Sequence, residues 1–441
     1  MNVLFVSLGC DKNLVDTEVM LGLLAQKGHQ MVDSEDMADV IVVNTCCFIH
    51  DAKEESIQTI LEMAEYKKAG TLKALIVTGC LAQRYKQEIL DEIEEVDAVL
   101  GTTSYDKIVD AIEHALEGKK TLELQDIDAL PLVDTKRMVT TGGHFAYLKI
   151  AEGCDKHCTY CIIPKIRGNF RSVPMERLIS EAEELASQGV KELILVAQET
   201  TLYGKDIYGE KSLHVLLKEL CKVRGIRWIR VLYCYPEEIT DELIQVIKEE
   251  DKICKYLDLP IQHASDAVLK RMGRRTSKAQ LVEIVEKLRR EIPEIALRTT
   301  LITGFPGETQ EQHEELMDFI DEMEFDRLGV FTYSPEEDTP AAMMSDQIDE
   351  EIKEDRQAEL MELQQEIAFD LAEDMVGREV LVMIEGKVAD ENVYVGRTYK
   401  DAPNVDGLIF VESGEELMSG DFAKVKVTGA LEYDLIGEII S

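Results

Sequence analysis

Short apolar runs alternate with amphipathic segments over the first 117 residues, and no other feature limits so strongly what this chain can fold into. The apolar runs are VLFVSLG, DVIVVNT and ALIVTG, and the amphipathic segments lie near residues 12–27, 51–67, 81–94 and 105–116. Strands that alternate with helical crossovers form a parallel sheet with helices on both faces. We therefore predict a doubly wound parallel α/β domain over residues 1–117, followed by a linker over 118–139.

The alternation resumes on a longer scale in residues 140–372. Candidate strands lie at 145–150, 192–197, 228–233, 255–260, 297–302 and 327–333. Helical patterns at 174–188, 212–223, 238–249, 277–291 and 309–323 separate most of them. Six strands with helical crossovers predict a full or partial β/α barrel. A long charged helix over about 348–375 is expected to brace this barrel against the tail.

The tail has a different rhythm. After Gly377 the runs EVLVMIEGKV, NVYVGRTY, GLIFVES and DFAKVKVTGALEYDLIGEII are divided by turn residues. Closely spaced strands with turns between them predict a small antiparallel barrel or sandwich over residues 373–441.

Composition limits the surroundings and partners of the chain. No apolar run is long enough to span a bilayer, and residues 1–9 have the pattern of a strand rather than of a signal peptide, so a cytoplasmic location without membrane contact is expected. Ten cysteines in that compartment are expected to be free, metal-bound or catalytic. The net charge of −39 opposes strong nucleic-acid binding; it fits either solubility alone or a basic partner, such as a ribosomal protein.

The stretch GCDKHCTYCIIP, residues 153–164, carries Cys154, Cys158 and Cys161 in the spacing C-x3-C-x2-C. It follows the first predicted barrel strand and therefore lies at the mouth where barrel sites form. Structural zinc requires a fourth ligand, for which only His157 is at hand within the loop. The spacing favours an iron–sulfur cluster instead. Because a cubane normally takes four thiolates, three cysteines leave one iron open.

Three further cysteines, Cys10, Cys46 and Cys80, each follow one of the N-terminal strands. The carboxyl ends of parallel strands meet at one edge of a sheet, so we expect these thiols to converge and to hold a second cluster. The alternative is three separate core cysteines. Cys47 is interpreted as a packing residue or as a spare ligand in place of Cys46. The remaining Cys221, Cys234 and Cys254 are expected in the core.

The C-x3-C-x-aromatic-C loop resembles that of the radical S-adenosylmethionine (SAM) enzymes. The resemblance implies that the open iron binds the amino and carboxylate groups of SAM, whose one-electron cleavage gives a 5′-deoxyadenosyl radical. SLGCDKNLVDTE, VNTCCFI, VTGCLAQR and EGCDKHCTYCIIPKIRG together resemble the methylthiotransferases of this superfamily, and the tail resembles their TRAM domain. This family implies two 4Fe-4S clusters, the N-terminal one donating sulfur, with cluster-borne catalysis to which no single side chain is assigned. An electron donor such as a flavodoxin or ferredoxin is also implied.

Two branches of this family differ in substrate. One modifies an adenosine in tRNA, and the other modifies the β-carbon of an aspartate in ribosomal protein uS12. The motifs CDKNLVDTE, DAPNVDG and EYDLIGEI resemble the second branch, although Cys47 stands where a glycine is usual. From Val376 onward the tail has 13 acidic and 6 basic residues, a net charge of −7 that opposes RNA binding. The uS12 branch is therefore predicted. The tRNA branch and a non-enzymatic two-cluster electron carrier are the alternatives.

The resemblance also suggests which residues contact SAM. Gln198 and Glu199 end a barrel strand where such enzymes often bind the SAM amino group, and Tyr160 is expected near the adenine. Gln262 follows the strand over 255–260 and either lines the pocket or forms part of its rim. Gly304, in the turn GFPGET, either lines the pocket or serves the turn alone.

Overall fold

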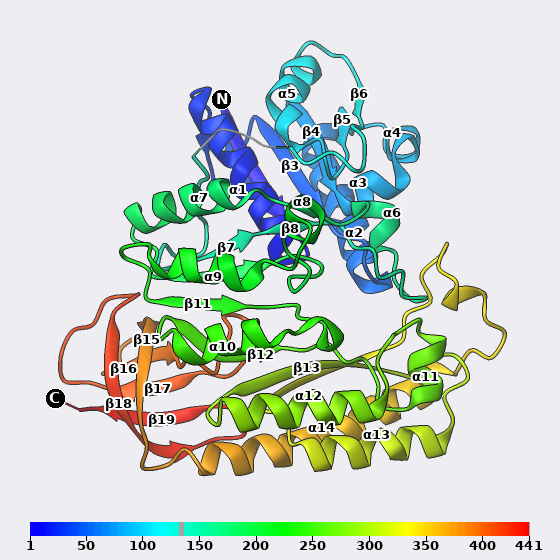
Figure 1. Ribbon diagram of the computed structural model, residues 1–441. Coiled ribbons are helices and arrows are strands. Elements are labelled where there is room, and N and C mark those ends of the chain that lie inside the picture. Colours follow the sequence, from blue (N-terminus) through cyan, green and yellow to red (C-terminus); the bar gives the residue numbers. More distant parts are fainter. Residues whose placement is uncertain (132–135, 441) are drawn as a thin grey trace.

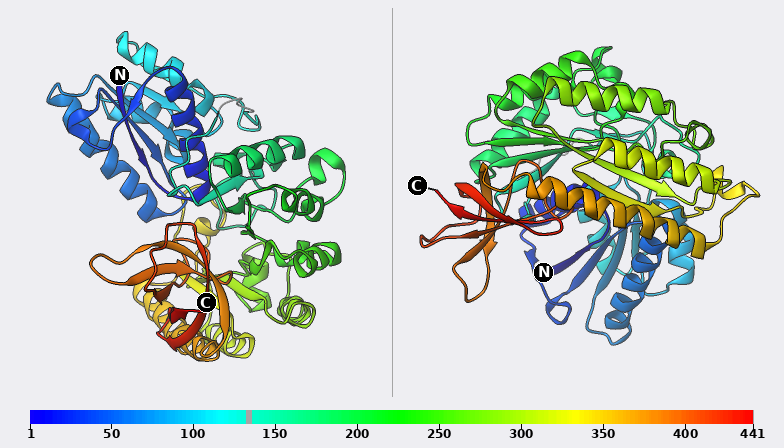
Figure 2. Two further views of the ribbon diagram at one scale, coloured as in Figure 1. Left: turned by 90° about the vertical axis from the view of Figure 1, so that its left-hand side faces the viewer. Right: turned by 90° about the horizontal axis from the view of Figure 1, so that it is seen from below.

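The computed structural model describes residues 1–131 and 136–440. In this part of the chain, two six-stranded sheets and a closed five-stranded barrel follow one another along the sequence (Figure 1). The turned views place the N-terminal domain and the C-terminal barrel on the same side of the central domain (Figure 2). The predicted class, an α/β chain that ends in a small β-barrel, is confirmed.

The N-terminal sheet is parallel throughout and has the order β2-β1-β3-β4-β5-β6. Its strands are β1 (Asn2–Ser7), β2 (Gln30–Met31), β3 (Val40–Thr45), β4 (Ala74–Gly79), β5 (Ala98–Leu100) and β6 (Thr121–Glu123). The helices are α1 (Asp11–Gln26), η1 (Glu35–Met37), α2 (His50–Lys68), α3 (Cys80–Tyr85), α4 (Gln87–Glu92), η2 (Tyr105–Lys107) and α5 (Ile108–Leu116). One core joins the sheet to α2, α3 and α4, and another joins it to α1 and α5, so the predicted doubly wound arrangement is confirmed.

Two details of the N-terminal prediction are wrong. The helix expected over 81–94 is two helices, because Lys86 between them has a φ of 49°, in the left-handed region. Residues 121–123, assigned to the linker, form the edge strand β6, which pairs with β5. Residues 132–135 of that linker lie outside the described residues. The domain boundaries at 117, 139 and 372 stay predictions.

The central sheet is also parallel and has the order β14-β13-β12-β11-β10-β7. Its strands are β7 (Phe145–Lys149), β10 (Glu192–Val196), β11 (Trp228–Val231), β12 (Ile253–Asp258), β13 (Ala296–Thr303) and β14 (Arg327–Thr332). The helices are α6 (Ile163–Arg167), α7 (Met175–Ser187), α8 (Lys205–Tyr208), α9 (Leu213–Cys221), η3 (Pro236–Glu238), α10 (Asp241–Glu249), α11 (Asp266–Arg271), α12 (Lys278–Glu291) and α13 (Gln310–Met323). Among the described residues β7 and β14 do not pair, so the barrel is partial; a separate short ladder joins β8 (Ala151–Glu152) to β9 (Arg171–Ser172).

Residues of the central strands alternate between two apolar layers, as pleated strands require. Leu193 and Leu195 of β10 pack in the layer formed with the outer helices. Ile194 of the same strand packs in the opposite layer, together with Val15 of α1 and Met383 of the C-terminal barrel. The inner face of the partial barrel is therefore covered from two sides by the other two domains.

The C-terminal strands are β15 (Glu379–Lys387), β16 (Val393–Arg397), β17 (Ile409–Glu412), β18 (Phe422–Ala430) and β19 (Leu435–Ile439). They close in the order β15-β16-β17-β19-β18. The prediction of a purely antiparallel barrel is wrong at one pair, because β17 and β19 run parallel. The long helix α14 (Glu350–Glu373), preceded by η4 (Ala341–Met343), packs along β14 and α13 and reaches β18, as expected of a brace.

A buried charge network holds the C-terminal barrel against the central sheet. Glu192, with no exposed surface, accepts hydrogen bonds from Arg230 Nε at 2.9 Å and Arg397 Nη2 at 2.7 Å. Arg397 Nε also pairs with Glu385 at 2.6 Å. Within residues 1–131 and 136–440, no helix combines the length and the apolar character that crossing a bilayer requires.

Arg397→Ala is expected to lower the free energy of unfolding by about 3–5 kcal/mol, because the fully buried Glu192 loses one of the two cations that compensate its charge. Chemical denaturation followed by tryptophan fluorescence measures the change, since Trp228 lies under the barrel residue Phe422. The matched control is Lys222→Ala, which breaks only an exposed pair with Glu219 and should cost less than about 1 kcal/mol. Equal losses in the two variants would contradict this account.

Candidate functional site

Three cysteines lie at one edge of the N-terminal sheet, which we call the N-terminal cysteine edge: Cys10, Cys46 and Cys80. Strands β1, β3 and β4 are neighbours in register, with Ser7 opposite Asn44 and Asn44 opposite Thr78. The segments that follow these three strands therefore leave the sheet at the same edge. A Cβ atom added to Gly9 would lie 2.7 Å from Cys46 Cβ, and the Cys10 and Cys46 charges both act on the Cys80 thiol. The structure therefore brings the three predicted residues together.

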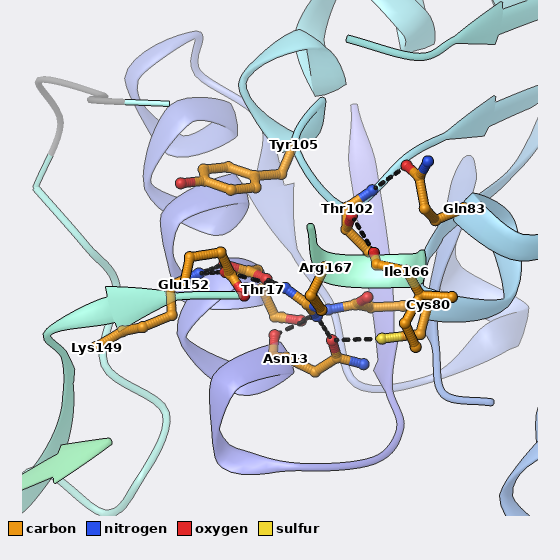
Figure 3. Close-up of polar contacts among 12 residues, drawn as sticks. Asn13, Thr17, Cys80, Gln83, Thr102, Tyr105, Lys149, Glu152, Ile166 and Arg167 are labelled. Atoms are coloured by element: carbon orange, nitrogen blue, oxygen red, sulfur yellow. Dashed lines mark hydrogen bonds and ion pairs between the residues drawn. The ribbon is translucent and has the colours of Figure 1, made fainter. Parts of the chain in front are cut away.

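Asn13 joins the ends of these three strands. Its Nδ2 donates to Leu8 O at 3.1 Å and to Thr45 O at 2.8 Å. Its Oδ1 lies 3.8 Å from the Cys80 thiol, which donates to it (Figure 3). The side chain is fully buried in the first turn of α1. Sequence reasoning missed this residue, because an asparagine near the start of a helix normally indicates a cap.

Burial changes the acidity of the thiols at this edge. Burial raises the pKa of Cys46 and of Cys80, and it raises the pKa of Cys47 to about 12. A buried thiol gives up its proton when a bound metal compensates the negative charge. Cys10 is exposed. Cys47 packs among the apolar side chains under α2, which supports its interpretation as a packing residue.

The stretch 153–164, which we call the radical loop, folds back on residues that follow it. Cys154 N donates to Gly168 O at 3.1 Å, and Cys161 N donates to Cys158 O at 3.1 Å. Burial raises the pKa of Cys154 to about 12 and also raises the pKa of Cys161, with the Cys158 charge adding to both effects. The three thiols thus lie within electrostatic reach of one another.

The arrangement does not fit the zinc alternative. His157, the candidate fourth ligand, is exposed. In the described part of the chain, no three or more His, Cys, Asp or Glu side chains are placed to hold a single metal ion. A cubane distributes its ligands over four irons and takes soft thiolates, which are the ligand type that this loop supplies.

Buried polar atoms without partners gather where the central strands end. Among the described residues, Gln198 Oε1 and Glu199 Oε2 after β10 accept no hydrogen bond. Glu199 is fully buried, its other oxygen accepts from Thr201 N at 2.9 Å, and burial raises its pKa to about 7. Lys156 of the radical loop forms an ion pair with Glu199 Oε2 at 3.7 Å. Because an unpaired buried polar atom costs about 1–3 kcal/mol, these atoms fit a polar ligand.

Arg274 adds a positive charge to the same place, and sequence reasoning missed it. Its guanidinium is buried and lies 4.3 Å from the ring centre of Tyr235, whose hydroxyl is 3.9 Å from Cys158 Sγ. Nη2 donates to Pro260 O at 2.7 Å, whereas Nε and Nη1 have no partner among the residues that the structure describes. The arrangement offers groups of both signs beside the radical loop, as a ligand with ammonium and carboxylate groups requires.

The other predicted contacts lie around this place with less definite roles. Tyr160 packs with Phe305 and Tyr333. Gln262 has a φ of 73° and bridges to β13 through its backbone. A Cβ atom on Gly304 would lie 2.3 Å from Lys353 Cγ, so the space that this glycine leaves open is filled by α14. Contact of these residues with SAM stays a prediction.

Two segments connect the radical loop to the N-terminal cysteine edge. Ile162 and Ile166, around helix α6, pack in the same core as Cys80, and Ile166 O accepts from Thr102 Oγ1 at 2.8 Å (Figure 3). The segment after β11 reaches both sites: Tyr233 donates to Asp11 Oδ1 at 3.1 Å, and Tyr235 contacts Cys158. The two sets of cysteines therefore lie on either side of one domain interface.

Three family models match the chain in succession. An uncharacterized protein family, UPF0004, matches residues 2–101, the radical SAM superfamily matches 148–320, and the TRAM domain matches 376–440. The solved structure of the radical SAM methyltransferase TsrM from Kitasatospora setae is similar, with a TM-score of 0.55 and 14% identity over 88% of this chain and 79% of that one. The cobalamin-dependent SAM radical enzyme OxsB has a TM-score of 0.53 at 12% identity over 82% of this chain and 56% of that one. At such identities these two structures show the fold alone.

Curated relatives are much closer in sequence. A protein of Lachnoclostridium phytofermentans is 66% identical over 437 residues, 99% of both chains, and one of Clostridium botulinum is 52% identical over 99% of this chain and 98% of that one. One of Clostridioides difficile is 50% identical over 98% of both chains. All three are named ribosomal protein uS12 methylthiotransferase RimO.

A partial β/α barrel whose first strand leads into a C-x3-C-x2-C loop, in a chain that matches the superfamily model, defines a radical SAM enzyme. The chain belongs to the RimO family of ribosomal protein uS12 methylthiotransferases. The predicted family and the predicted TRAM domain are confirmed, and the non-enzymatic electron carrier is excluded.

In metal-free, anaerobic protein, Cys47 is expected to react with iodoacetamide far more slowly than the exposed Cys10. With a pKa of about 12, Cys47 is ionised to about one part in ten thousand at about pH 8, and only the thiolate reacts. Its rate should rise about tenfold per pH unit, because the pH stays below that pKa. Peptide mass spectrometry measures both rates, and urea-unfolded protein is the control. Equal labelling in the folded protein would refute the burial argument.

Proposed function

We propose that this chain transfers a methylthio group to the β-carbon of an aspartate in ribosomal protein uS12, using SAM and two 4Fe-4S clusters. The observation that supports the proposal is the position of two sets of three cysteines beside one domain interface, in a chain 66% identical to a RimO protein. The proposal assigns residues 1–117 to the methylthiotransferase N-terminal domain, 118–139 to a linker, 140–372 to the radical SAM core and 373–441 to the TRAM domain.

In this proposal Cys154, Cys158 and Cys161 hold the radical SAM cluster. Cys10, Cys46 and Cys80 hold the second cluster. Thiolates are the ligands that such clusters use, and the buried thiols of Cys46, Cys80 and Cys154, whose pKa burial raises, fit a bound cation. When bound, the two clusters supply the one-electron cleavage of SAM at the radical loop and the sulfur at the N-terminal cysteine edge.

The chain's own residues bind and orient SAM. Glu199 and Gln198 each offer the ammonium group an oxygen that accepts no hydrogen bond, and Arg274 offers the carboxylate two nitrogens that donate none. Tyr235, stacked on Arg274, holds that guanidinium beside the radical loop. Glu199 and Arg274 are buried, so their electrostatic interactions with the ligand are strengthened.

Charge supports a basic protein as substrate. The net charge of −39, and of −7 from Val376 onward, favours approach of a cationic partner such as a ribosomal protein and opposes strong nucleic-acid binding. A cytoplasmic location and reduction by a flavodoxin or ferredoxin belong to the same proposal.

The intact mass of uS12 tests the reaction. In a strain that lacks this gene, uS12 is expected to lose one methylthio group, and the wild-type gene should restore it. Cys80→Ala should not restore it, whereas Cys254→Ala, a buried cysteine of the central core, should. If the mass of uS12 is unchanged and 2-methylthio nucleosides disappear from tRNA, the tRNA alternative is correct.

Iron counting tests the two clusters separately. Anaerobically reconstituted protein is expected to hold about eight irons, and a Cys10→Ala, Cys46→Ala, Cys80→Ala triple variant about four. The Cys221→Ala, Cys234→Ala, Cys254→Ala triple variant, which changes only core cysteines, controls for the loss of three thiols. About four irons in the wild-type protein would limit the proposal to one cluster.

Glu199→Gln is expected to weaken SAM binding by roughly 10- to 100-fold, because it removes a charged hydrogen bond of about 1.5–3 kcal/mol. Since the pKa of Glu199 is raised to about 7, wild-type affinity should fall as the pH drops from about 8 to about 6 and protonates the carboxylate. The variant should lose this pH dependence. Calorimetry on the loaded protein measures both effects, with the exposed Glu210→Gln as control. An unchanged affinity would exclude Glu199 from the site.

A further inference from the structure

Arg167 ends helix α6, six residues after the last cysteine of the radical loop, yet its side chain points into the N-terminal domain (Figure 3). It is 2% exposed. Nη2 donates to Asn13 Oδ1, the atom that also accepts from the Cys80 thiol. A residue of the central domain therefore contacts the side chain that ties together the three strand ends of the N-terminal cysteine edge.

The other terminal nitrogen of the guanidinium lies among a compact set of charged groups. Nη1 donates to Asp16 Oδ2 at 2.9 Å and to Glu152 Oε2 at 3.2 Å. Lys149 pairs with both carboxylates as well. Two cations and two carboxylates thus compensate one another, and Glu152 also accepts from Gln198 Nε2 at 2.8 Å, which continues the network toward the proposed SAM site.

The charge of the guanidinium acts on two thiols of the N-terminal cysteine edge. Its charge opposes the effect of burial on the pKa of Cys80 and of Cys46. Because an arginine stays protonated under all ordinary conditions, this charge is permanent. A fixed cation in a buried place acts through a low dielectric constant, and the carboxylates of Asp16 and Glu152 offset part of its charge.

We propose that Arg167 is a positioning residue for the N-terminal cluster: it fixes the cysteine-bearing strand ends through Asn13 and, by its charge, raises the reduction potential of the cluster held there. Reduction adds negative charge, which a nearby cation stabilises. The proposal rests on the proposed function, since it requires iron at the N-terminal cysteine edge. According to this proposal, a residue of the central domain adjusts the reduction potential of a cluster in the N-terminal domain.

The test uses the full chain with Cys154, Cys158 and Cys161 replaced by alanine, so that only the N-terminal edge loads. An anaerobic redox titration read by electron paramagnetic resonance gives the midpoint potential. Arg167→Gln is expected to lower the potential, and Arg167→Lys to keep it closer to the parent value. Asp16→Asn, which removes a negative charge 2.9 Å from the guanidinium, should raise it. The control is Arg397→Gln, an equally buried arginine at the other domain interface, which should leave the potential unchanged.

Opposite shifts in the Gln and Asn variants distinguish an effect of charge from a general loosening of the site. If both variants shift the potential in the same direction, or neither shifts it, the proposal is overturned. Should Arg167→Gln fail to fold, the sign of the Asp16→Asn shift decides. If the parent protein of this series loads no iron, the N-terminal cluster of the proposed function is refuted instead, and the two failures are thereby told apart.

Discussion

Helix α6 joins two sheet edges that belong to different domains, and the rest of the site depends on this contact. It starts two residues after Cys161 and packs through Ile166 into the core that contains Cys80. Because parallel strands direct their carboxyl ends to one edge, both sets of cysteines lie next to the interface between the two domains.

The interfaces of the central domain with the other two domains contain buried charges, and each of these charges is paired with an opposite one. Arg167, Asp16, Lys149 and Glu152 compensate one another where the N-terminal domain meets the central sheet. Glu192 with its two arginines does the same where the C-terminal barrel meets that sheet. Removing one member of such a set leaves a buried charge incompletely compensated, which is costly. The strongly acidic charge of the whole chain is thus a property of its surface, while its interfaces are balanced.

Elements were predictable from sequence where their pattern is long and their burial complete. Strand β4 lies where the run ALIVTG predicts it, because every residue of that run is buried between helices. The edge strand β6 was missed because three residues that pair on one side only carry too little pattern. The parallel pairing of β17 with β19 depends on how the barrel closes, which no local periodicity expresses.

The sequence by itself determined at which edge of each sheet the two sets of three cysteines lie. All strands of a parallel sheet run in one direction, so residues that follow the strands lie at the same edge. The sequence also determined the family, through motifs that each span only a few residues. Only the tertiary structure decided which polar side chains serve these sites: Arg167 reaches Asn13 across 154 positions, and Arg274 lies beside Cys158. Such partners are chosen by domain packing, because a buried charge is stable only where that packing brings an opposite charge, an acceptor or a ligand to it.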